Sequence, residues 1–327
     1  MTERYRDDLP EVEKKGWVLS NRVRDIARHN RIDGRLALER FVSESILWAL
    51  RKVSSDPFMV KGGLLHDQRE RETGDADVMY AERRSAVQLY GEIGEAAALL
   101  RQHGILWVPG EVQAMSMGGR GEGFRVPVVA KVGPSRVNTH LDVSFGAFPA
   151  GTVSREFRSM FKGPAFTAYA QPLEAQAADK FAAIAAIVTI GSTNTRLKDF
   201  ADLHRLHGMG LDNEAVARHL HRTMRERKAD MALLLQPVPD GLSFEYADAH
   251  RAAWKEMVAR SDRDRGLPTD FSDLASDVRF WWADVQERLV DLAERDQLEP
   301  RRRIEAPSIQ PDDRGVYDLA AYRKMRA

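Results

Sequence analysis

Three aspartates and a pair of glycines are the residues of this sequence whose types and spacing could do chemistry. Asp75 and Asp77 stand two residues apart in a segment that alternates polar and apolar side chains. Residues i and i+2 of a β-strand project from the same face, so both carboxylates could bind divalent cations at one site. Asp142 lies in a second alternating segment and would supply a third carboxylate.

The glycine pair Gly62-Gly63 follows a short apolar run and comes before the two neighbouring aspartates. Without a Cβ atom, such a turn lets backbone N–H groups approach triphosphate oxygens. Two Mg²⁺ ions about 4 Å apart can stabilise the entering and leaving oxygens of a displacement at phosphorus. The pattern therefore predicts phosphoryl transfer with two magnesium ions, for which manganese is an alternative. The plainer interpretation is that Asp75 and Asp77 lie on an ordinary solvated strand face.

The elements that must position these residues are mixed in the first half of the chain. Helical spacing of apolar residues predicts a helix over 36–53, with Asp33 as a cap, and another from Ser85 to residue 102. The glycine-rich segment 117–123 predicts a hairpin loop rather than a phosphate cradle, because no helical pattern follows it. Five short apolar or alternating segments predict strands: 58–60, 76–80, 105–108, 124–132 and 138–145.

Beyond residue 165 the periodicity is helical almost throughout. A long helix is predicted from Leu173 to Val188, and others begin near Asp212 and Phe271. We therefore expect three parts. They are an α/β domain with N-terminal helices (1–165), a helical domain that completes the cleft (166–298), and a linker or docking tail (299–327).

One lysine of the long helix, Lys180, lies on the face that should point inward. Such a lysine needs an anion. Either it pairs with a local carboxylate or snorkels to solvent, or it meets a substrate triphosphate. The next helical segment carries Asp199 within a run of charged residues, which taken alone is typical of a solvated face.

Composition excludes several classes of protein. The 327 residues contain no cysteine, so disulfides and thiolate metal sites are excluded. No apolar stretch approaches the ~18 residues of a membrane helix, and the polar first residues are unlike a signal peptide. We expect a soluble cytoplasmic protein. Lysine and arginine total 49, as do aspartate and glutamate, so only local basic patches could support RNA binding.

The order of these motifs is similar to that of one known family. The segments VKGG, RETGDADV, HLDVSFG, QPLEAQAADKFAAI and TRLKDFADL resemble a nucleotidyltransferase toxin of the abortive-infection AbiEii/AbiGii type, across roughly residues 55–210. This family lies within the DNA-polymerase-β-like nucleotidyltransferase superfamily. The resemblance implies an α+β fold, in which a polymerase-β-like domain with a mixed sheet is followed by a mostly helical half.

The resemblance also implies roles for the residues that match the motifs in the first half. Gly62 and Gly63 would form the turn that binds the nucleotide phosphates. Asp75 and Asp77 would be the ligands of both metal ions. Asp142 would be the third metal-binding carboxylate, near the attacking hydroxyl.

In the second half, Lys180 and Asp199 match the active-site lysine and aspartate of the family, and Lys180 would also contact the nucleotide. Two residues depart from the family pattern. Leu64 stands where relatives often have serine or threonine, which removes a phosphate-binding hydroxyl. Lys198 stands where arginine is usual, which keeps the charge but loses the bidentate fork.

The implied activity is transfer of a nucleoside monophosphate from an NTP to an acceptor hydroxyl, with pyrophosphate released. The expected acceptor is RNA, with the tRNA 3′ end as one case. The chain would be the toxin of a toxin–antitoxin or phage-defence system and would have a cognate antitoxin. Alternatives are a protein or small-molecule acceptor, and a nucleotide-binding regulator without turnover. The basic residues that could contact RNA phosphates are Arg120, Arg125, Lys131, Arg136, Arg222, Arg225, Arg227 and Lys228.

A regulatory hypothesis concerns Thr73, which lies two residues before Asp75. Phosphorylation there would place about two negative charges beside the metal-binding carboxylates and block triphosphate binding. The alternative is that Thr73 only serves the turn.

Overall fold

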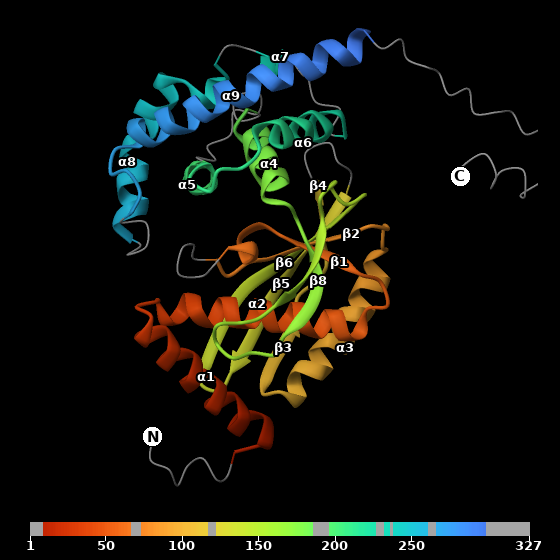
Figure 1. Ribbon diagram of the computed structural model, residues 1–327. Coiled ribbons are helices and arrows are strands. Elements are labelled where there is room, and N and C mark those ends of the chain that lie inside the picture. Colours follow the sequence, from red (N-terminus) through yellow and green to blue (C-terminus); the bar gives the residue numbers. More distant parts are fainter. Residues whose placement is uncertain are drawn as a thin grey trace, which may run out of the picture.

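The computed structural model describes residues 9–66, 73–116, 122–185, 196–226, 232–235, 238–260 and 266–298. Its N-terminal half is a mixed sheet covered on one face by three helices, and its C-terminal half is helical (Figure 1). The predictions for the loop at 117–121, for the continuation of the long helix past residue 185 and for the tail at 299–327 lie outside the described residues.

The three helices of the first half are α1 (Glu11–His29), α2 (Gly34–Val53) and α3 (Ala86–Gln102). Asp33 caps α2, since its side chain accepts hydrogen bonds from the backbone N–H groups of Arg35 and Leu36. Ser85 caps α3 in a capping box with Gln88. Both caps confirm the sequence prediction, although α2 begins two residues earlier than expected.

Helix α1 was not delimited from the sequence. It docks through Gly16, where an added Cβ would lie 2.5 Å from the backbone nitrogen of Gly133 and 2.8 Å from the carbonyl oxygen of Gly104. This approach of one backbone to another is possible only for glycine.

The sheet runs in the order β3-β5-β6-β2-β1-β8-β7, and β4 pairs with β5. Two pairs are parallel, β1 with β8 and β2 with β6, and the others are antiparallel. Strands β7 and β8 were missed, although Gly151 comes just before β7 and Gly163-Pro164 just before β8 as turn signals. The strands are β1 (Phe58–Lys61), β2 (Ala76–Tyr80), β3 (Ile105–Pro109), β4 (Gln113–Ser116), β5 (Glu122–Val132), β6 (Ser135–Phe145), β7 (Val153–Phe157) and β8 (Phe166–Ala170).

The first hydrophobic core lies between the sheet and helices α1, α2 and α3. On β2, Ala76 and Val78 are buried in this core, and on β6, Leu141 and Val143 are buried beside them. Because strand side chains alternate, the residues between them project from the opposite face. The period-two pattern thus places apolar residues towards the helices and the aspartates on the other face.

The second core is formed by the C-terminal helices and is centred on Trp254, Trp281 and Trp282. In Figure 1 these helices lie above the sheet, and α1 lies at its lower end. They are α4 (Leu173–Ala185), α5 (Leu197–His207), α6 (Asn213–Glu226), α7 (Ala232–Leu235), α8 (Phe244–Arg260) and α9 (Phe271–Leu298). Strand β8 belongs to the sheet and the first core, so the two cores meet just after it. The division into domains at residue 165 stays a prediction.

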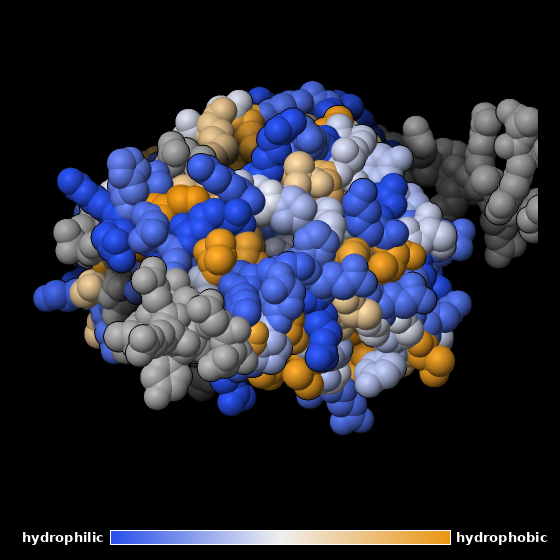
Figure 2. Space-filling view, turned by 90° about the horizontal axis from the view of Figure 1, so that it is seen from below, coloured by the Kyte–Doolittle hydropathy of each residue, from blue (hydrophilic) through white to orange (hydrophobic). Residues whose placement is uncertain are grey.

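The surface seen from the α1 end is mostly hydrophilic, with apolar side chains in small separate groups (Figure 2). Within the described part of the chain, no helix combines the length and the apolar character that crossing a membrane requires.

Candidate active site

A row of four charged side chains crosses the sheet. Asp77 on β2 and Asp142 on β6 are direct partners in a parallel pair. Lys61 on β1 is opposite Asp77, and Arg125 on β5 is opposite Asp142. Paired residues of neighbouring strands have Cβ atoms roughly 5 Å apart on one face. We call Lys61, Asp77, Asp142 and Arg125 the charged row; it brings together two aspartates that are far apart in the sequence.

One end of the charged row is a forked ion pair. Arg125 donates through Nε to Oδ1 of Asp142 at 2.8 Å and through Nη2 to Oδ2 at 2.6 Å. Hydrogen bonding to Asp142 raises the pKa of Arg125 above its ordinary value. The sequence analysis offered Arg125 as an RNA contact and did not predict this fork, which depends on the strand register that places it opposite Asp142.

Asp75 lies beside the charged row and contacts His140. Nδ1 of His140 is 3.2 Å from Oδ1 of Asp75, and its Nε2 is 3.6 Å from Oδ2 of Asp142. The imidazole therefore lies between two of the three candidate carboxylates. The sequence placed His140 on the same face as Asp142 but assigned it no role; its position two residues before Asp142 was the available signal.

The carboxyl group of Asp77 has a raised pKa. Burial raises the pKa of this carboxyl to about 6, and the neighbouring charges of Asp142 and Asp75 add to the rise, against the lowering effect of Lys61 and His140. At neutral pH the ionised form is therefore disfavoured relative to an isolated aspartate. A bound cation would relieve this repulsion.

The glycine turn packs directly against Asp77. Gly62 has φ +64°, and a Cβ added there would lie 2.3 Å from Oδ2 of Asp77. Glycine is required at this position both by the left-handed backbone and by the contact. Gly63 is buried in the 3₁₀ turn η2 (Gly62–Leu65) that follows.

Helix α4 holds the glycine turn through Gln176. Its Nε2 donates to the carbonyl oxygen of Gly62 at 3.1 Å, and its Oε1 lies 2.9 Å from Nε2 of His66. Gln176 was not singled out from the sequence, since a glutamine in a helix carries no specific signal.

Lys180 lies one helical turn after Gln176, on the same side of α4. Its ammonium group is 2.9 Å from Oδ1 of Asp199 and 2.6 Å from Oδ2 of Asp202 on α5. Pairing with local carboxylates, one of the two alternatives drawn from the sequence, is present in the structure, and contact of Lys180 with a triphosphate stays a prediction. Asp202 was assigned no role, although its spacing of three from Asp199 puts both on one helix face.

A divalent metal can be tested against this site through its donor set. Within the described residues, no three His, Cys, Asp or Glu side chains are grouped so as to hold an ion. Nevertheless, Asp75 and Asp77 offer only oxygen donors, which hard cations prefer, and the pKa of Asp77 is raised first by burial and then by the nearby carboxylate of Asp142. These residues therefore fit magnesium, whereas Asp142 is held by Arg125.

Three other residues singled out from the sequence are placed as follows. Thr73 is only 9% exposed, so a kinase would reach its hydroxyl only if the segment opened; its regulatory role stays a prediction. Leu64 is buried in the first core, where an apolar side chain is favourable. Lys198 is exposed at the start of α5.

Several of the basic residues suggested as RNA contacts have acidic partners. Lys131 pairs with Glu13 at 3.2 Å, and Nε of Arg222 pairs with Glu226 at 2.6 Å. Nε of Arg136 donates to the amide oxygen of Asn138 at 3.3 Å, and this neutral partner does not neutralise the charge of Arg136. Arg120, Arg227 and Lys228 lie outside the described residues.

Comparison with known proteins gives one family match. The family model described as nucleotidyl transferase AbiEii toxin, type IV toxin–antitoxin system, matches residues 45–283. Among curated proteins, none matches the chain. Two similar solved structures come from Helicobacter pylori. One is described as a candidate nucleotidyltransferase, with 15% identity, TM-score 0.45, and 77% of this chain and 97% of that chain covered. The other is JHP933, with 14% identity, TM-score 0.41, and coverages of 78% and 95%.

Proposed function

The chain belongs to the AbiEii family of nucleotidyltransferase toxins of type IV toxin–antitoxin systems, and from this premise we propose that it transfers a nucleoside monophosphate from an NTP to an acceptor hydroxyl with divalent metal. Membership of the family implies a nucleotide substrate and an antitoxin partner. The observation that carries the proposal is the direct pairing of Asp77 with Asp142 across β2 and β6, beside the left-handed turn at Gly62.

The residues of the first half would bind and align the triphosphate. Asp75 and Asp77 would hold magnesium, and the backbone N–H groups after Gly62 would bind phosphate oxygens. When bound, the metal would neutralise triphosphate charge and lower the pKa of the acceptor hydroxyl. Asp142 would orient that hydroxyl, whose oxygen bonds to the α-phosphorus while the bond to the β-phosphate oxygen breaks.

The second half would act on the leaving group. Lys180 would offset the charge that develops on the departing pyrophosphate. Asp199 and Asp202 would hold its ammonium group in place, as their distances of 2.9 and 2.6 Å indicate. The hydrogen bond from Gln176 to the carbonyl of Gly62 supports a position of α4 next to the phosphate turn.

An RNA acceptor is supported by a basic depression near the start of β6. This depression of about 530 Å³ is bordered by four arginines, which could contact successive phosphates. Arg136 stands six residues before Asp142 on the same strand, or about 20 Å along it. A single-stranded acceptor could therefore contact this surface while its end lies at the charged row. The four arginines are Arg24, Arg28, Arg35 and Arg136.

The test is incorporation of label from each α-³²P NTP into three separate pools: total RNA, protein extract and small metabolites. We expect label on RNA, no label when EDTA is present, and no label with Asp77→Ala. Label on protein alone would exclude RNA as the acceptor, and label that persists in EDTA would exclude the metal mechanism.

One observation favours a second candidate, a nucleotide-binding regulator without turnover. Both carboxylate oxygens of Asp142 are engaged by Arg125, so this group is not open in the structure. The test is to incubate the protein with NTP and RNA in the absence of the antitoxin. If NTP binds and no pyrophosphate is released, the result supports a regulator without turnover and contradicts the proposed transferase activity.

A further inference from the structure

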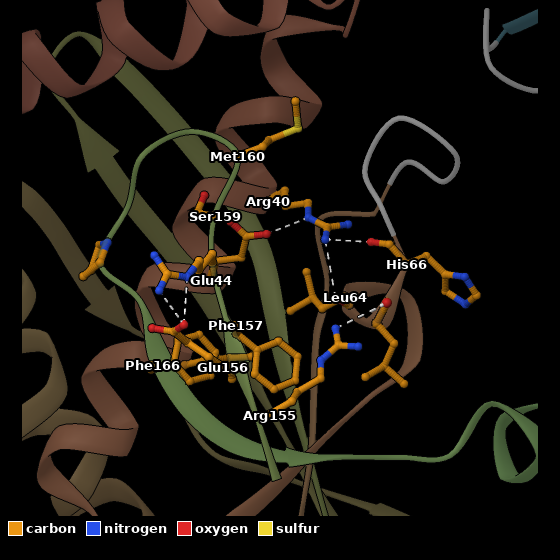
Figure 3. A pocket seen from close by; sticks show the side chains of 14 residues that line it. Arg40, Glu44, Leu64, His66, Arg155, Glu156, Phe157, Ser159, Met160 and Phe166 are labelled. Carbon is orange, nitrogen blue, oxygen red and sulfur yellow. Dashed lines mark hydrogen bonds and ion pairs between the residues drawn. The ribbon is translucent and has the colours of Figure 1, made fainter. Parts of the chain in front are cut away.

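A cavity of about 360 Å³ lies on the α2 side of the sheet, away from the face that carries the charged row. Its walls come from α2, from the turn after Gly62, from β7 and from the loop that leads to β8 (Figure 3). None of the residues assigned to catalysis lines it. The volume lies within the range of small-molecule sites, which begins near 300 Å³.

The inner wall of the cavity holds a buried donor and a buried acceptor without partners. Arg40 is only 6% exposed; its Nε donates to Oε1 of Glu44 at 2.7 Å and its Nη2 to the carbonyl oxygen of His66 at 2.9 Å. Nη1 of Arg40 and Oε2 of Glu44 are buried and have no hydrogen-bond partner in the described structure. A buried polar atom without a hydrogen bond destabilises the protein, and a ligand with both a donor and an acceptor would relieve this cost.

The outer wall holds a guanidinium group stacked on an aromatic ring. Arg155 lies over the ring of Phe157, 4.4 Å from its centroid, and Phe157 in turn stacks on Phe166. Figure 3 shows Arg155 on the same side of the cavity as Arg40, with Leu64 between them. Within the described residues, no carboxylate forms an ion pair with Arg155. Partial burial, and to a smaller extent the nearby charge of Arg40, lower the pKa of Arg155 below its ordinary value.

We propose that this cavity binds a small phosphorylated ligand of about the size of a nucleoside monophosphate. Its phosphate would accept hydrogen bonds from the fork of Arg155, whose planar geometry suits phosphate oxygens. Its planar polar group would meet the unpartnered atoms of Arg40 and Glu44. Leu47, Leu64 and Met160 add apolar surface to the lining of the cavity.

The cavity is connected to the phosphate turn by a short chain of hydrogen bonds. Arg40 holds the carbonyl oxygen of His66, the ring of His66 contacts Gln176, and Gln176 donates to the carbonyl oxygen of Gly62. A ligand that moves Arg40 would therefore move the turn at Gly62 through these hydrogen bonds, without entering the catalytic site. This consequence for transfer rests on the proposed function, whereas binding in the cavity does not.

The test uses the full-length chain carrying Asp75→Ala and Asp77→Ala, in EDTA, so that binding at the catalytic site is removed. Isothermal titration is run with inorganic phosphate, with AMP and GMP, and with a dinucleotide phosphodiester. The titrations are repeated with two further proteins, in which either Arg155→Ala or Arg40→Lys is combined with the two aspartate substitutions. Lysine at position 40 keeps the positive charge but loses the forked geometry of the guanidinium group. Arg101→Ala, an exposed arginine at the end of α3, is the matched control.

We expect at least one nucleoside monophosphate to bind, and its affinity to fall about tenfold or more with Arg155→Ala and with Arg40→Lys, but not with Arg101→Ala. Preference for the dinucleotide would identify RNA as the source of the phosphate group. The proposal is overturned if no phosphate compound binds, or if binding is unchanged in both arginine variants. Because the catalytic aspartates are absent from this protein, failure here leaves the proposed transferase untouched, and success here does not depend on it.

Discussion

Two groups of charged residues in this molecule contain the same residue types and behave in opposite ways. In the charged row, two aspartates lie side by side on partly open sheet surface, and the pKa of Asp77 rises to about 6. In the helical half, Lys180 lies between Asp199 and Asp202, and the carboxylate of Asp202 is almost fully buried. In the first group, Lys61 and His140 do not offset the effects of burial and of the neighbouring carboxylates on Asp77; in the second, each carboxylate contacts the ammonium group of Lys180.

The difference shows which group is destabilised by its own charges and which is held together by its own ion pairs. A buried ion pair holds two elements in one geometry, here α4 against α5, and is costly to break. Adjacent like charges instead reduce the stability of the empty protein and are retained where a ligand brings the opposite charge. We therefore expect substitutions in the row to affect chemistry most, and those in the helical group to affect stability most.

The largest expected effect is on transfer. Asp77→Ala should reduce nucleotide incorporation about a thousandfold or more, because the metal would lose a ligand and the phosphates their alignment. The measurement is the initial rate of label transfer from the preferred NTP. Asp248→Ala, which removes an exposed aspartate of α8, is the control and should leave the rate unchanged. Near-normal incorporation by Asp77→Ala would remove the distinction between the two groups.

The next effect is on folding. Asp202→Ala should lower the free energy of unfolding by about 3–5 kcal/mol, because it breaks a buried pair and leaves the charge of Lys180 less compensated. Urea denaturation followed by circular dichroism measures this change. The double variant Lys180→Met, Asp202→Leu should recover part of the loss, since Lys180 is no longer left without the Asp202 carboxylate and Asp199 keeps Arg196 at 3.6 Å. A loss below about 1 kcal/mol for Asp202→Ala would contradict a structural role for the helical group.

A smaller change in the free energy of unfolding, opposite in sign to that of Asp202→Ala, is expected when Asp77 of the charged row is substituted. The pKa of Asp77 is raised above the unfolded value of roughly 3.9, so the folded state holds more protons between about pH 4 and 6, and its stability falls as the pH rises through that window. Asp77→Asn removes this dependence. In EDTA at pH 8 it should raise the free energy of unfolding by about 1–3 kcal/mol, with little change at pH 4. Equal stability of the two proteins at pH 8 would show that the row is not strained by charge.

The sequence was sufficient for the local parts of this arrangement. Alternation on β2 and β6 predicted the face of Asp77 and Asp142, and the caps Asp33 and Ser85 predicted two helix starts. These features depend on residues close together in the chain, where the physical rules are strong. The family match also confirms the nucleotidyltransferase fold that the motif order implied.

The sequence analysis missed contacts that depend on register and docking. The two-residue turn Gly133-Pro134 joins β5 and β6 in a hairpin whose register puts Arg125 opposite Asp142, and the sequence analysis did not use this turn to pair the two strands. The position of Gln176 against the glycine turn depends on how α4 approaches the sheet. The buried position of Arg40 was missed because an arginine in an amphipathic helix normally points to solvent.

The smallest expected effect concerns the fork between Arg125 and Asp142. The side chain of Arg125 is 42% exposed, so this ion pair adds little to the stability of the protein. The guanidinium group nevertheless competes with any cation that approaches Asp142. Arg125→Gln should therefore tighten Mn²⁺ binding severalfold, measured by isothermal titration without nucleotide, with little change in unfolding free energy. Arg136→Gln removes the same charge from the adjacent strand β6, outside the row, and is the matched control. If both variants shift Mn²⁺ affinity equally, the gain is only a general change of charge; if only Arg125→Gln does, the cation site includes Asp142 and the row acts as a unit.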